Sequence, residues 1–286
     1  MHAKLHKHLE NQLGHDKLKV RSIQGGDINQ AYLLETSEAS YFVKCNNDDC
    51  AVDMLEKEAK ALRLFADLKI IGVPDVILSD KCGDDAYLVL EYLKPKPPNT
   101  KFWRHFGAQM SALHQVSTDR FGWSFDNYIG TLPQSNQRHQ KWSDFYAAER
   151  ILPQLVLARN KGLIDREEWA KGNRLAANIR DVCPEEPPSL IHGDLWSGNF
   201  IASQGDIPIL IDPAPYYGHR EMDLAMSMLF GGFSKDFYDS YLASSPLEGD
   251  FKQRCDIYQL YYLLVHLNLF GMSYHSAVSS ILAKYS

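Results

Sequence analysis

The sequence lacks the features typical of secreted, membrane-bound and nucleic-acid-binding proteins. Its five cysteines are scattered and form no C-x-x-C pair, which argues against a disulfide framework and a zinc site. The N-terminus is charged from Lys4 and has no apolar signal-peptide core, and the apolar stretch 258–272 is too short to span a bilayer. Acidic residues outnumber basic ones by 36 to 30. We therefore expect a cytoplasmic protein with no nucleic-acid or membrane partner.

The chain also has no internal repeat, no low-complexity tract and no G-x-x-x-x-G-K-[ST] motif, so a P-loop enzyme is excluded. What it does have is the composition of an ordinary globular protein, with 45% hydrophobic and 23% charged residues among 286. That length and composition are enough to bury one large core or two smaller ones.

The periodicity of the apolar residues changes along the chain. From Leu18 to Tyr92 the sequence predicts short strands around one helix, which the apolar stripe places at 53–68. The strands are expected at 31–36, 40–45, 76–78 and 87–90. The histidines His2, His6 and His8 are better explained by one end of a solvated amphipathic helix than by a metal cluster.

A proline cluster at 94–98 is the best candidate for a domain boundary. Beyond it helical patterns dominate, at 99–117, 140–160, 165–182, 222–230, 234–243 and 251–284. The exception is an apolar island at 189–212, which predicts strands at 189–191, 199–202 and 207–211. We expect an α+β protein with a β-rich N-terminal lobe over 1–93 and a larger, mainly helical lobe over 94–286.

The strongest motif lies in this island, where His192-Gly-Asp194-Leu-x-x-x-Asn199 is followed by Asp212 at the end of another strand. Phosphoryl transfer needs one carboxylate to accept the proton of the attacking hydroxyl. It also needs hard oxygen ligands for Mg²⁺, which a carboxylate and an amide supply. The spacing is that of the kinase catalytic loop H-R-D-L-x-x-x-N, with Gly in place of Arg. These residues predict Asp194 as the base and Asn199 and Asp212 as the metal ligands.

A kinase also needs a strand lysine at the phosphates and a helical glutamate to hold it. Lys44 ends a β-rich run and Glu58 lies in the following helix; Glu56 is a rival, but the apolar stripe places Glu58 nearer the inward edge. Gly25 and Gly26 could let the backbone approach phosphates, although a plain turn is the alternative.

The run Glu91-Tyr92-Leu93 leads from a buried strand into the proline cluster. In a kinase this segment offers backbone groups to adenine, so side chains there would matter little.

The string His192-Gly-Asp-Leu-Trp-Ser-Gly-Asn199 resembles the signature of the fructosamine kinase (ketosamine kinase) family, in the protein-kinase-like and aminoglycoside-phosphotransferase-like superfamily. Supporting similarities span nearly the whole chain and include 127–134 and 212–225. The Pro-Ala that follows Asp212 differs from the Phe-Gly of protein kinases, so a protein-kinase-type activation loop is not expected.

The resemblance implies a bilobal protein-kinase-like fold and ATP- and Mg²⁺-dependent phosphorylation of the C3 hydroxyl of ketosamines, free or on lysine. The labile product then sheds its sugar, which is a deglycation repair. Lys44, held by Glu58, would clamp the phosphates. Trp196 either gives the sugar an apolar face or packs in the core.

Four further polar residues are expected to support the site. His192 braces the catalytic loop and Asp223 is a structural partner of its backbone, while His219 and Glu221 are assigned only general support. Two other functions stay open: a kinase for another alcohol, such as choline or an aminoglycoside, and an ATP-binding module without activity. The second is disfavoured because the base, the lysine and the metal ligands are all present. The sequence does not indicate an oligomeric state.

Overall fold

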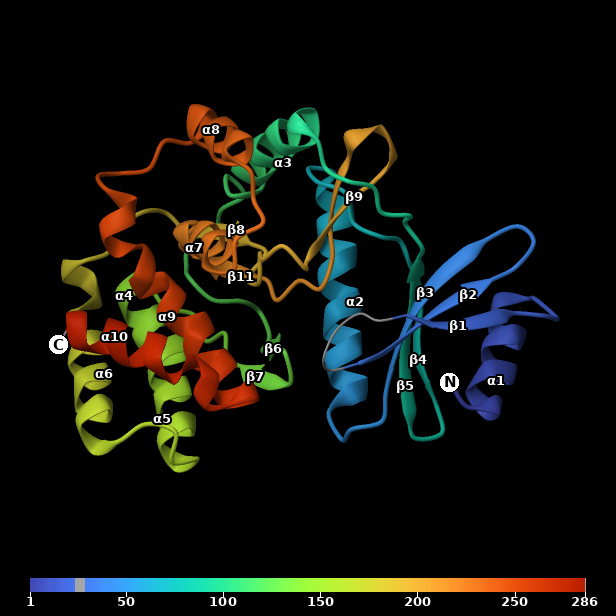
Figure 1. Cartoon of the computed structure of the whole chain (residues 1–286), viewed down its shortest axis with the longest axis horizontal. Helices are drawn as coiled ribbons and strands as arrows, with labels where there is room; N and C mark the ends of the chain where they lie inside the picture. Colours follow the sequence, from blue (N-terminus) through green and yellow to red (C-terminus); the bar gives the residue numbers. More distant parts are fainter. Residues whose placement is uncertain (24–28, 286) are drawn as a thin grey trace. The chain divides into compact units, whose positions relative to one another are not determined.

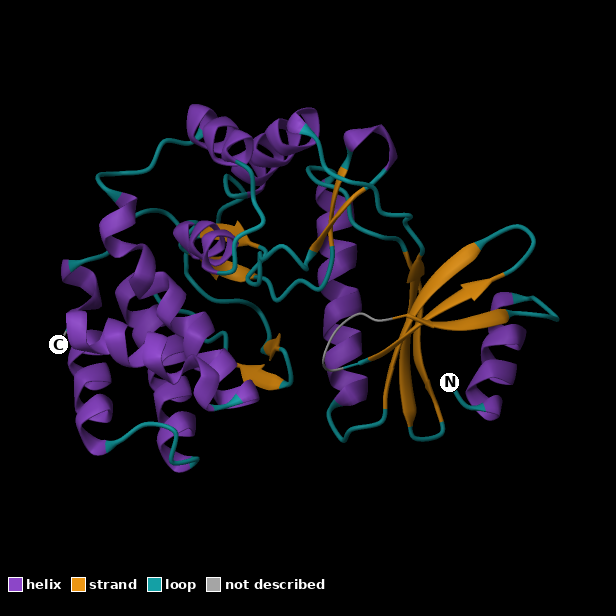
Figure 2. Ribbon diagram, viewed as in Figure 1, coloured by secondary structure: helices purple, strands orange, loops and turns teal. Residues whose placement is uncertain are grey.

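The computed structural model describes residues 1–23 and 29–285, and its contacts group the chain into two units (Figures 1 and 2). The N-terminal unit comprises Met1–Asn99 and Ile201–Pro213, and the C-terminal unit comprises Thr100–Phe200 and Ala214–Ser286. The grouping therefore assigns one short segment from the predicted C-terminal lobe to the N-terminal unit. One unit is built on a sheet and the other mainly on helices, so the predicted α+β class is confirmed.

The N-terminal unit contains a five-stranded antiparallel sheet in the order β1-β2-β3-β5-β4 (Figure 2). Its strands are β1 (Lys19–Ile23), β2 (Gln30–Glu35), β3 (Ser40–Asn46), β4 (Val76–Cys82) and β5 (Asp85–Glu91). In this register Lys44 of β3 lies between Ala31 of β2 and Leu88 of β5. The lysine thus comes from a central strand, where the backbone on both sides is fixed by pairing.

Helices α1 (Ala3–Leu13) and α2 (Ala51–Leu68) bury apolar side chains against the sheet. Alternate residues of β5 join two different clusters: Leu88 packs with residues of α2, and Val89 packs with residues of α1. This is the two-residue periodicity of a strand that is covered on both faces. As predicted, the N-terminal histidines lie at one end of a helix, α1, whose N-cap His2 is exposed. The His2 ring also contacts the Asp85 carboxylate, and the half-buried His8 contacts Tyr87 Oη at 2.9 Å.

Backbone hydrogen bonds attach the segment Ile201–Pro213 to the rest of the N-terminal unit. The Leu210 N–H donates to the Gly72 carbonyl at 2.8 Å, and the Lys96 N–H donates to the Ala202 carbonyl at 2.9 Å. A Cβ on Gly72 would lie 2.9 Å from the Pro208 carbonyl oxygen, so this close backbone contact favours glycine. Strands β9 (Phe200–Ala202) and β10 (Pro208–Leu210) pair here and lead directly into Asp212.

The C-terminal unit is mainly helical. Its helices are α3 (Thr100–Leu113), α4 (Trp142–Phe145), α5 (Leu152–Asn160), α6 (Arg166–Asn178), α7 (Glu221–Leu229), α8 (Lys235–Ser244), α9 (Phe251–Phe270) and α10 (His275–Lys284). A π-helical segment, Tyr146–Ile151, joins α4 to α5. The predicted helix at 251–284 is wrong in one respect, because Gly271, at φ +85°, interrupts it between α9 and α10.

Short strand pairs complete the C-terminal unit: β6 (Asn127–Ile129) with β7 (Leu132–Gln134), and β8 (Ser189–Ile191) with β11 (Tyr216–Gly218). The pair of β8 and β11 supports the loop that carries His192 and Asp194. Within residues 1–23 and 29–285, no helix has the length and apolar character needed to cross a membrane.

Candidate active site

Three charged side chains meet in the N-terminal unit. Lys44 Nζ of β3 donates to Glu58 Oε1 of α2 at 2.7 Å and also to Asp212 Oδ1 after β10. Lys44 is buried, with 6% of the residue exposed. The rival Glu56 is exposed and lies 4.0 Å from Lys60 Nζ instead. The lysine is therefore held between two carboxylates that come from different elements of the same unit.

Burial and charge act in opposite directions on this cluster. Burial alone would lower the pKa of Lys44, but the carboxylates of Asp212 and Glu58 outweigh it, so the pKa of Lys44 is raised. Burial raises the pKa of Glu58, against the opposing effect of the Lys44 ammonium. The ammonium therefore keeps its charge, and it is a donor suited to phosphate oxygens.

Asp212 has an unusual backbone conformation, with φ at +54°. Few residues other than glycine adopt this left-handed region, and such strain is concentrated at functional sites. The residue follows β10 and precedes Pro213, whose ring fixes its own backbone. The side chain of Asp212 is 39% exposed, so a carboxylate that pairs with Lys44 also reaches solvent.

The second group of predicted residues lies in the C-terminal unit, in the loop after β8. Asn199 Nδ2 donates to Asp194 Oδ2 and to the Asp194 carbonyl, each at 2.9 Å. Asn199 is only 5% exposed, so its orientation is fixed by these two bonds. With its amide nitrogen used in this way, its Oδ1 is the atom that remains as a hard oxygen ligand.

The backbone of this loop is held by a buried carboxylate. Asp223 of α7 accepts hydrogen bonds from the His192 N–H at 2.7 Å and the Gly193 N–H at 2.9 Å. Its Oδ2 also lies 3.1 Å from His114 Nε2 of α3, and His114 Nδ1 lies 2.7 Å from Tyr241 Oη. His114 could not be predicted from the sequence, because a single histidine in a helical pattern belongs to no motif.

Gly193 is required in the loop for two reasons. Its φ is +84°, and a Cβ placed on it would lie 2.1 Å from the Ala214 carbonyl oxygen. The Ala214 N–H in turn donates to the His192 carbonyl at 2.9 Å. The close approach of these two segments explains why glycine stands where protein kinases have arginine.

The other support residues lie in buried polar clusters of the C-terminal unit. His192 is fully buried, and its Nδ1 accepts the Asp194 N–H at 3.2 Å. Burial lowers the pKa of His219 to about 4, and its Nδ1 accepts the Glu221 N–H at 3.2 Å. Burial raises the pKa of Glu221, which forms a bidentate pair with Arg254. His219 and Glu221 thus brace the start of α7.

The predicted nucleotide segment at the end of β5 is only in part available for a ligand. The Glu91 N–H donates to the Asp75 carbonyl at 2.9 Å, and the Tyr92 N–H donates to the Ser40 carbonyl at 3.3 Å. The Leu93 N–H has no partner among the described residues, so it is the donor that remains. Gly25 and Gly26 lie outside the described residues.

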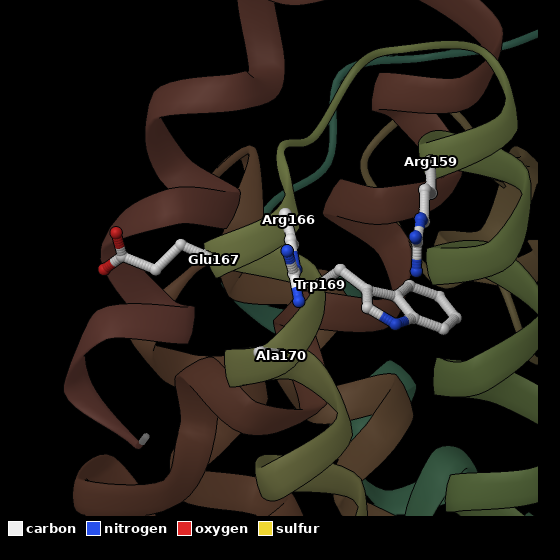
Figure 3. Close-up of a pocket in the computed structure, with 5 residues that line it drawn as sticks. All are labelled: Arg159, Arg166, Glu167, Trp169 and Ala170. Atoms are coloured by element: carbon white, nitrogen blue, oxygen red, sulfur yellow. The ribbon is translucent and has the colours of Figure 1, made fainter.

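Trp196 lies beside the predicted base and is 38% exposed, so it is not a core residue. Its ring covers Gly198, where a Cβ would meet the indole at 2.3 Å. A hollow of about 600 Å³ on α5 and α6, shown in Figure 3, is lined by Arg159, Arg166, Glu167, Trp169 and Ala170 and contains none of the predicted site residues. In the part of the chain that the structure describes, no three His, Cys, Asp or Glu side chains form a metal cluster.

The whole chain is similar to a known protein family. The family model for fructosamine kinase matches residues 1–286. A probable ketoamine kinase of Vibrio parahaemolyticus is 43% identical over 263 residues, which cover 90% of this chain and 88% of the relative.

Solved structures show the same fold. A crystal structure assigned as a fructosamine-3-kinase, from Haemophilus somnus, superposes with a TM-score of 0.87 at 30% identity, covering 99% of this chain and 96% of that one. A thermostable mutant of the aminoglycoside phosphotransferase APH(4)-Ia, in a complex with AMP-PNP and hygromycin B, reaches a TM-score of 0.67 at 16% identity, covering 100% of this chain and 99% of that one. The predicted protein-kinase-like fold is thereby confirmed, and the chain belongs to the fructosamine kinase family.

Proposed function

We propose that this protein is an ATP- and Mg²⁺-dependent kinase that phosphorylates the C3 hydroxyl of ketosamines, either as small molecules or on glycated lysine. The phosphorylated product is labile and loses its sugar, so the activity is a deglycation repair. Family membership over residues 1–286 supports phosphoryl transfer to a ketosamine. The observation that carries the proposal is the pairing of Asn199 with Asp194 on a loop whose backbone is fixed by Asp223.

Asp194 is the general base in this proposal. A base must be within hydrogen-bond reach of the hydroxyl whose proton it accepts. The two bonds from Asn199 Nδ2 hold the Asp194 carboxylate and carbonyl in one arrangement. Phosphoryl transfer depends mainly on positioning and electrostatic stabilisation, and a rigid loop supplies the positioning.

The donor chemistry of the two predicted ligands, Asn199 and Asp212, suits a magnesium ion. Asn199 has its Oδ1 free of the bonds that its Nδ2 makes, and the short hairpin of β9 and β10 connects it to Asp212 along the chain. One amide oxygen and one carboxylate suit Mg²⁺, which is usually held by few protein ligands together with waters and phosphates. When bound, the ion neutralises charge on the nucleotide phosphates.

Lys44 binds phosphate oxygens, and Glu58 holds its ammonium in place. The Leu93 N–H is the backbone donor offered to adenine. The structural neighbour APH(4)-Ia has been crystallised with AMP-PNP, which supports a nucleotide site on this fold. Gly25 and Gly26 are assigned to the nucleotide phosphates on the sequence alone, because they lie outside the described residues. Trp196 offers the sugar an apolar face.

The test is ATP consumption with Mg²⁺ against fructosamine, ribulosamine and erythrulosamine adducts, beside choline and an aminoglycoside. We expect turnover of ketosamines only. Asp194→Asn should lower kcat about 10²- to 10⁴-fold, the usual contribution of a positioned base, while Mg·ATP still binds. The matched control is Asp181→Asn, at an exposed aspartate of the same unit that pairs with Arg180.

Each result has a definite meaning. Turnover of choline or the aminoglycoside without any ketosamine would replace the proposed acceptor with another alcohol. Bound Mg·ATP without turnover of any acceptor on the panel would contradict the ketosamine kinase activity. An Asp194→Asn variant with the kcat of the parent protein would remove Asp194 as the base.

A further inference from the structure

An exposed row of aromatic side chains begins at Trp196 and continues over the ends of α7 and α9. We call it the aromatic strip and define it as Trp196, Phe230, His266, Phe270 and Tyr274. Trp196, Phe230 and Phe270 are 38%, 41% and 46% exposed. Large aromatic side chains are usually buried, so several in a row at the surface indicate a binding surface.

The members of the strip touch one another in order. The ring centroids of Trp196 and Phe230 are 6.3 Å apart, and those of Phe230 and His266 are 4.9 Å apart. The His266 ring lies 5.5 Å from Phe270 and 5.0 Å from Tyr274. All of these residues belong to the C-terminal unit, where α7 packs on α9. The strip is therefore one continuous surface that starts two residues from Asp194.

The Gly231-Gly232 turn fixes the strip to the catalytic loop. Gly232 has φ +91°, and a Cβ on it would lie 2.6 Å from Ser197 Cβ. The next residue, Phe233, packs against Phe106 and Phe237, which are both fully buried. Phe230 is thus held outside while the turn behind it is anchored in the core. A preformed surface loses little side-chain entropy when a ligand binds.

The chemistry of the strip suits one part of a ketosamine. A ketosamine joins its sugar to the rest of the molecule through a secondary amine that is cationic near neutral pH. Aromatic faces attract such cations and also cover apolar groups. Burial lowers the pKa of His266, and the contact of its Nδ1 with the Tyr262 carbonyl at 2.7 Å opposes this only in part, so the neutral ring is favoured over the cation. Sugar hydroxyls, in contrast, need polar partners that an aromatic row does not supply.

We propose that the aromatic strip binds the amine-bearing part of the acceptor and selects ketosamines whose amine carries an apolar or aromatic group. This inference rests on the proposed function and deepens it. The sugar lies at Trp196 beside Asp194, and the remainder of the acceptor extends over Phe230 toward Phe270. The site thus favours a sugar attached to an apolar side chain or amine over a small hydrophilic sugar amine.

The test compares the fructosamines of phenethylamine and of ethanolamine, which differ only in the group on the amine. We expect kcat/KM to be about tenfold higher for the phenethylamine compound, the value of one good aromatic contact. Phe270→Ser and Phe230→Ser should each bring this ratio close to one. The matched control, Phe125→Ser, removes an aromatic ring with a similar exposure of 37% in the same unit and should keep the ratio.

Binding of both compounds is also measured, by calorimetry with Mg²⁺ and AMP-PNP. This measurement separates a failure of the proposed kinase function from a failure of the aromatic strip as a binding site. Tighter binding of the phenethylamine compound without any phosphate transfer would contradict the ketosamine kinase function and support the aromatic strip as a site. Equal kcat/KM and equal binding of the two compounds would overturn the inference. It would also be overturned if Phe270→Ser left the ratio unchanged and instead converted a dimer to a monomer.

Discussion

The two units hold their candidate catalytic residues in different ways. In the N-terminal unit, Lys44 is fixed by direct contact with the carboxylates of Glu58 and Asp212. In the C-terminal unit, Asp223 holds the loop of Asp194 through the backbone N–H groups of His192 and Gly193. The first arrangement sets a charge and the second sets a backbone conformation.

Burial has opposite effects on a basic side chain in the two units. Lys44 and His219 are both buried, yet the pKa of Lys44 is raised and that of His219 is lowered. Lys44 has two carboxylates in contact, whereas the nearest carboxylate oxygen to His219 Nε2, that of Glu186, is 3.9 Å away. A buried cation is kept only where opposite charge compensates its desolvation. We therefore expect the N-terminal cluster to be disrupted by the loss of a charge, and the C-terminal loop to be disrupted by an added atom that changes its backbone conformation.

The largest effect is expected from a change of shape in the loop, Gly193→Ala. The added Cβ would overlap the Ala214 carbonyl at 2.1 Å in a backbone conformation that favours glycine. We expect kcat to fall about 10²-fold, as for an ångström-scale displacement of a catalytic group. The free energy of unfolding should fall by about 2–4 kcal/mol. Steady-state kinetics and urea unfolding measure the two effects.

Gly162→Ala is the matched control for this change. Gly162 has a similar φ of +69° but no atom within 4 Å of the added Cβ. In this variant the free energy of unfolding should fall by about 1 kcal/mol, the cost of the left-handed backbone for alanine, and kcat should not change. If both variants lost equal stability and neither lost activity, the close contact with Ala214 would have no role in holding the loop.

The next effect is expected from removal of charge in the N-terminal unit, Lys44→Met. The variant keeps a side chain of similar length but leaves Glu58 and Asp212 without their shared cation. We expect affinity for Mg·ATP to fall about 10- to 100-fold, the value of a charged hydrogen bond. Titration calorimetry measures it, with Lys60→Met as the control, at an exposed lysine on the helix that carries Glu58. Unchanged affinity in Lys44→Met would exclude a phosphate role for this lysine.

Much of the fold could be predicted because its apolar pattern is local. Strands β2, β3, β5 and β8 and most of the helices lie close to their expected positions. Helix α1 was not predicted beyond a helix end, because its Leu5 and Leu9 gain their burial from the sheet and not from a long apolar stripe. The break in the predicted helix 251–284 depends on the positive φ of Gly271, and an isolated glycine does not show this in advance.

Some residues of the candidate site could likewise be predicted from the sequence, and others could not. Asp194, Asn199, Asp212 and Lys44 could be proposed because they belong to motifs with fixed spacing. His114 and Tyr241 belong to no motif, and they join Asp223 only through the packing of α3, α7 and α8. The aromatic strip was missed for a related reason. Phe230 and Phe270 lie within helical patterns in which aromatic residues ordinarily indicate core.

The last effect is expected from pH acting on His219, and it concerns stability alone. The pKa of His219 is about 4 in the folded protein, below the ordinary value of 6.5, because burial disfavours its charged form. Between these two values the unfolded chain binds more protons than the folded one. The free energy of unfolding should therefore fall as pH falls from 6.5 toward 4, by at most about 1.4 kcal/mol per pH unit.

Urea unfolding at several pH values measures this slope. His219→Gln should flatten it, whereas His105→Gln, at an exposed position on α3, should not. The neighbouring Glu186 affects stability in a lower pH range than His219 does. Burial acts to raise its pKa, but the hydrogen bond from Arg220 helps to lower it below 4.5, so its contribution to stability is lost only at lower pH. An unchanged slope in His219→Gln would mean that this imidazole is charged in the folded protein. The desolvation cost of the His219 cation would then be offset by its surroundings, as the carboxylates of Glu58 and Asp212 offset that of Lys44.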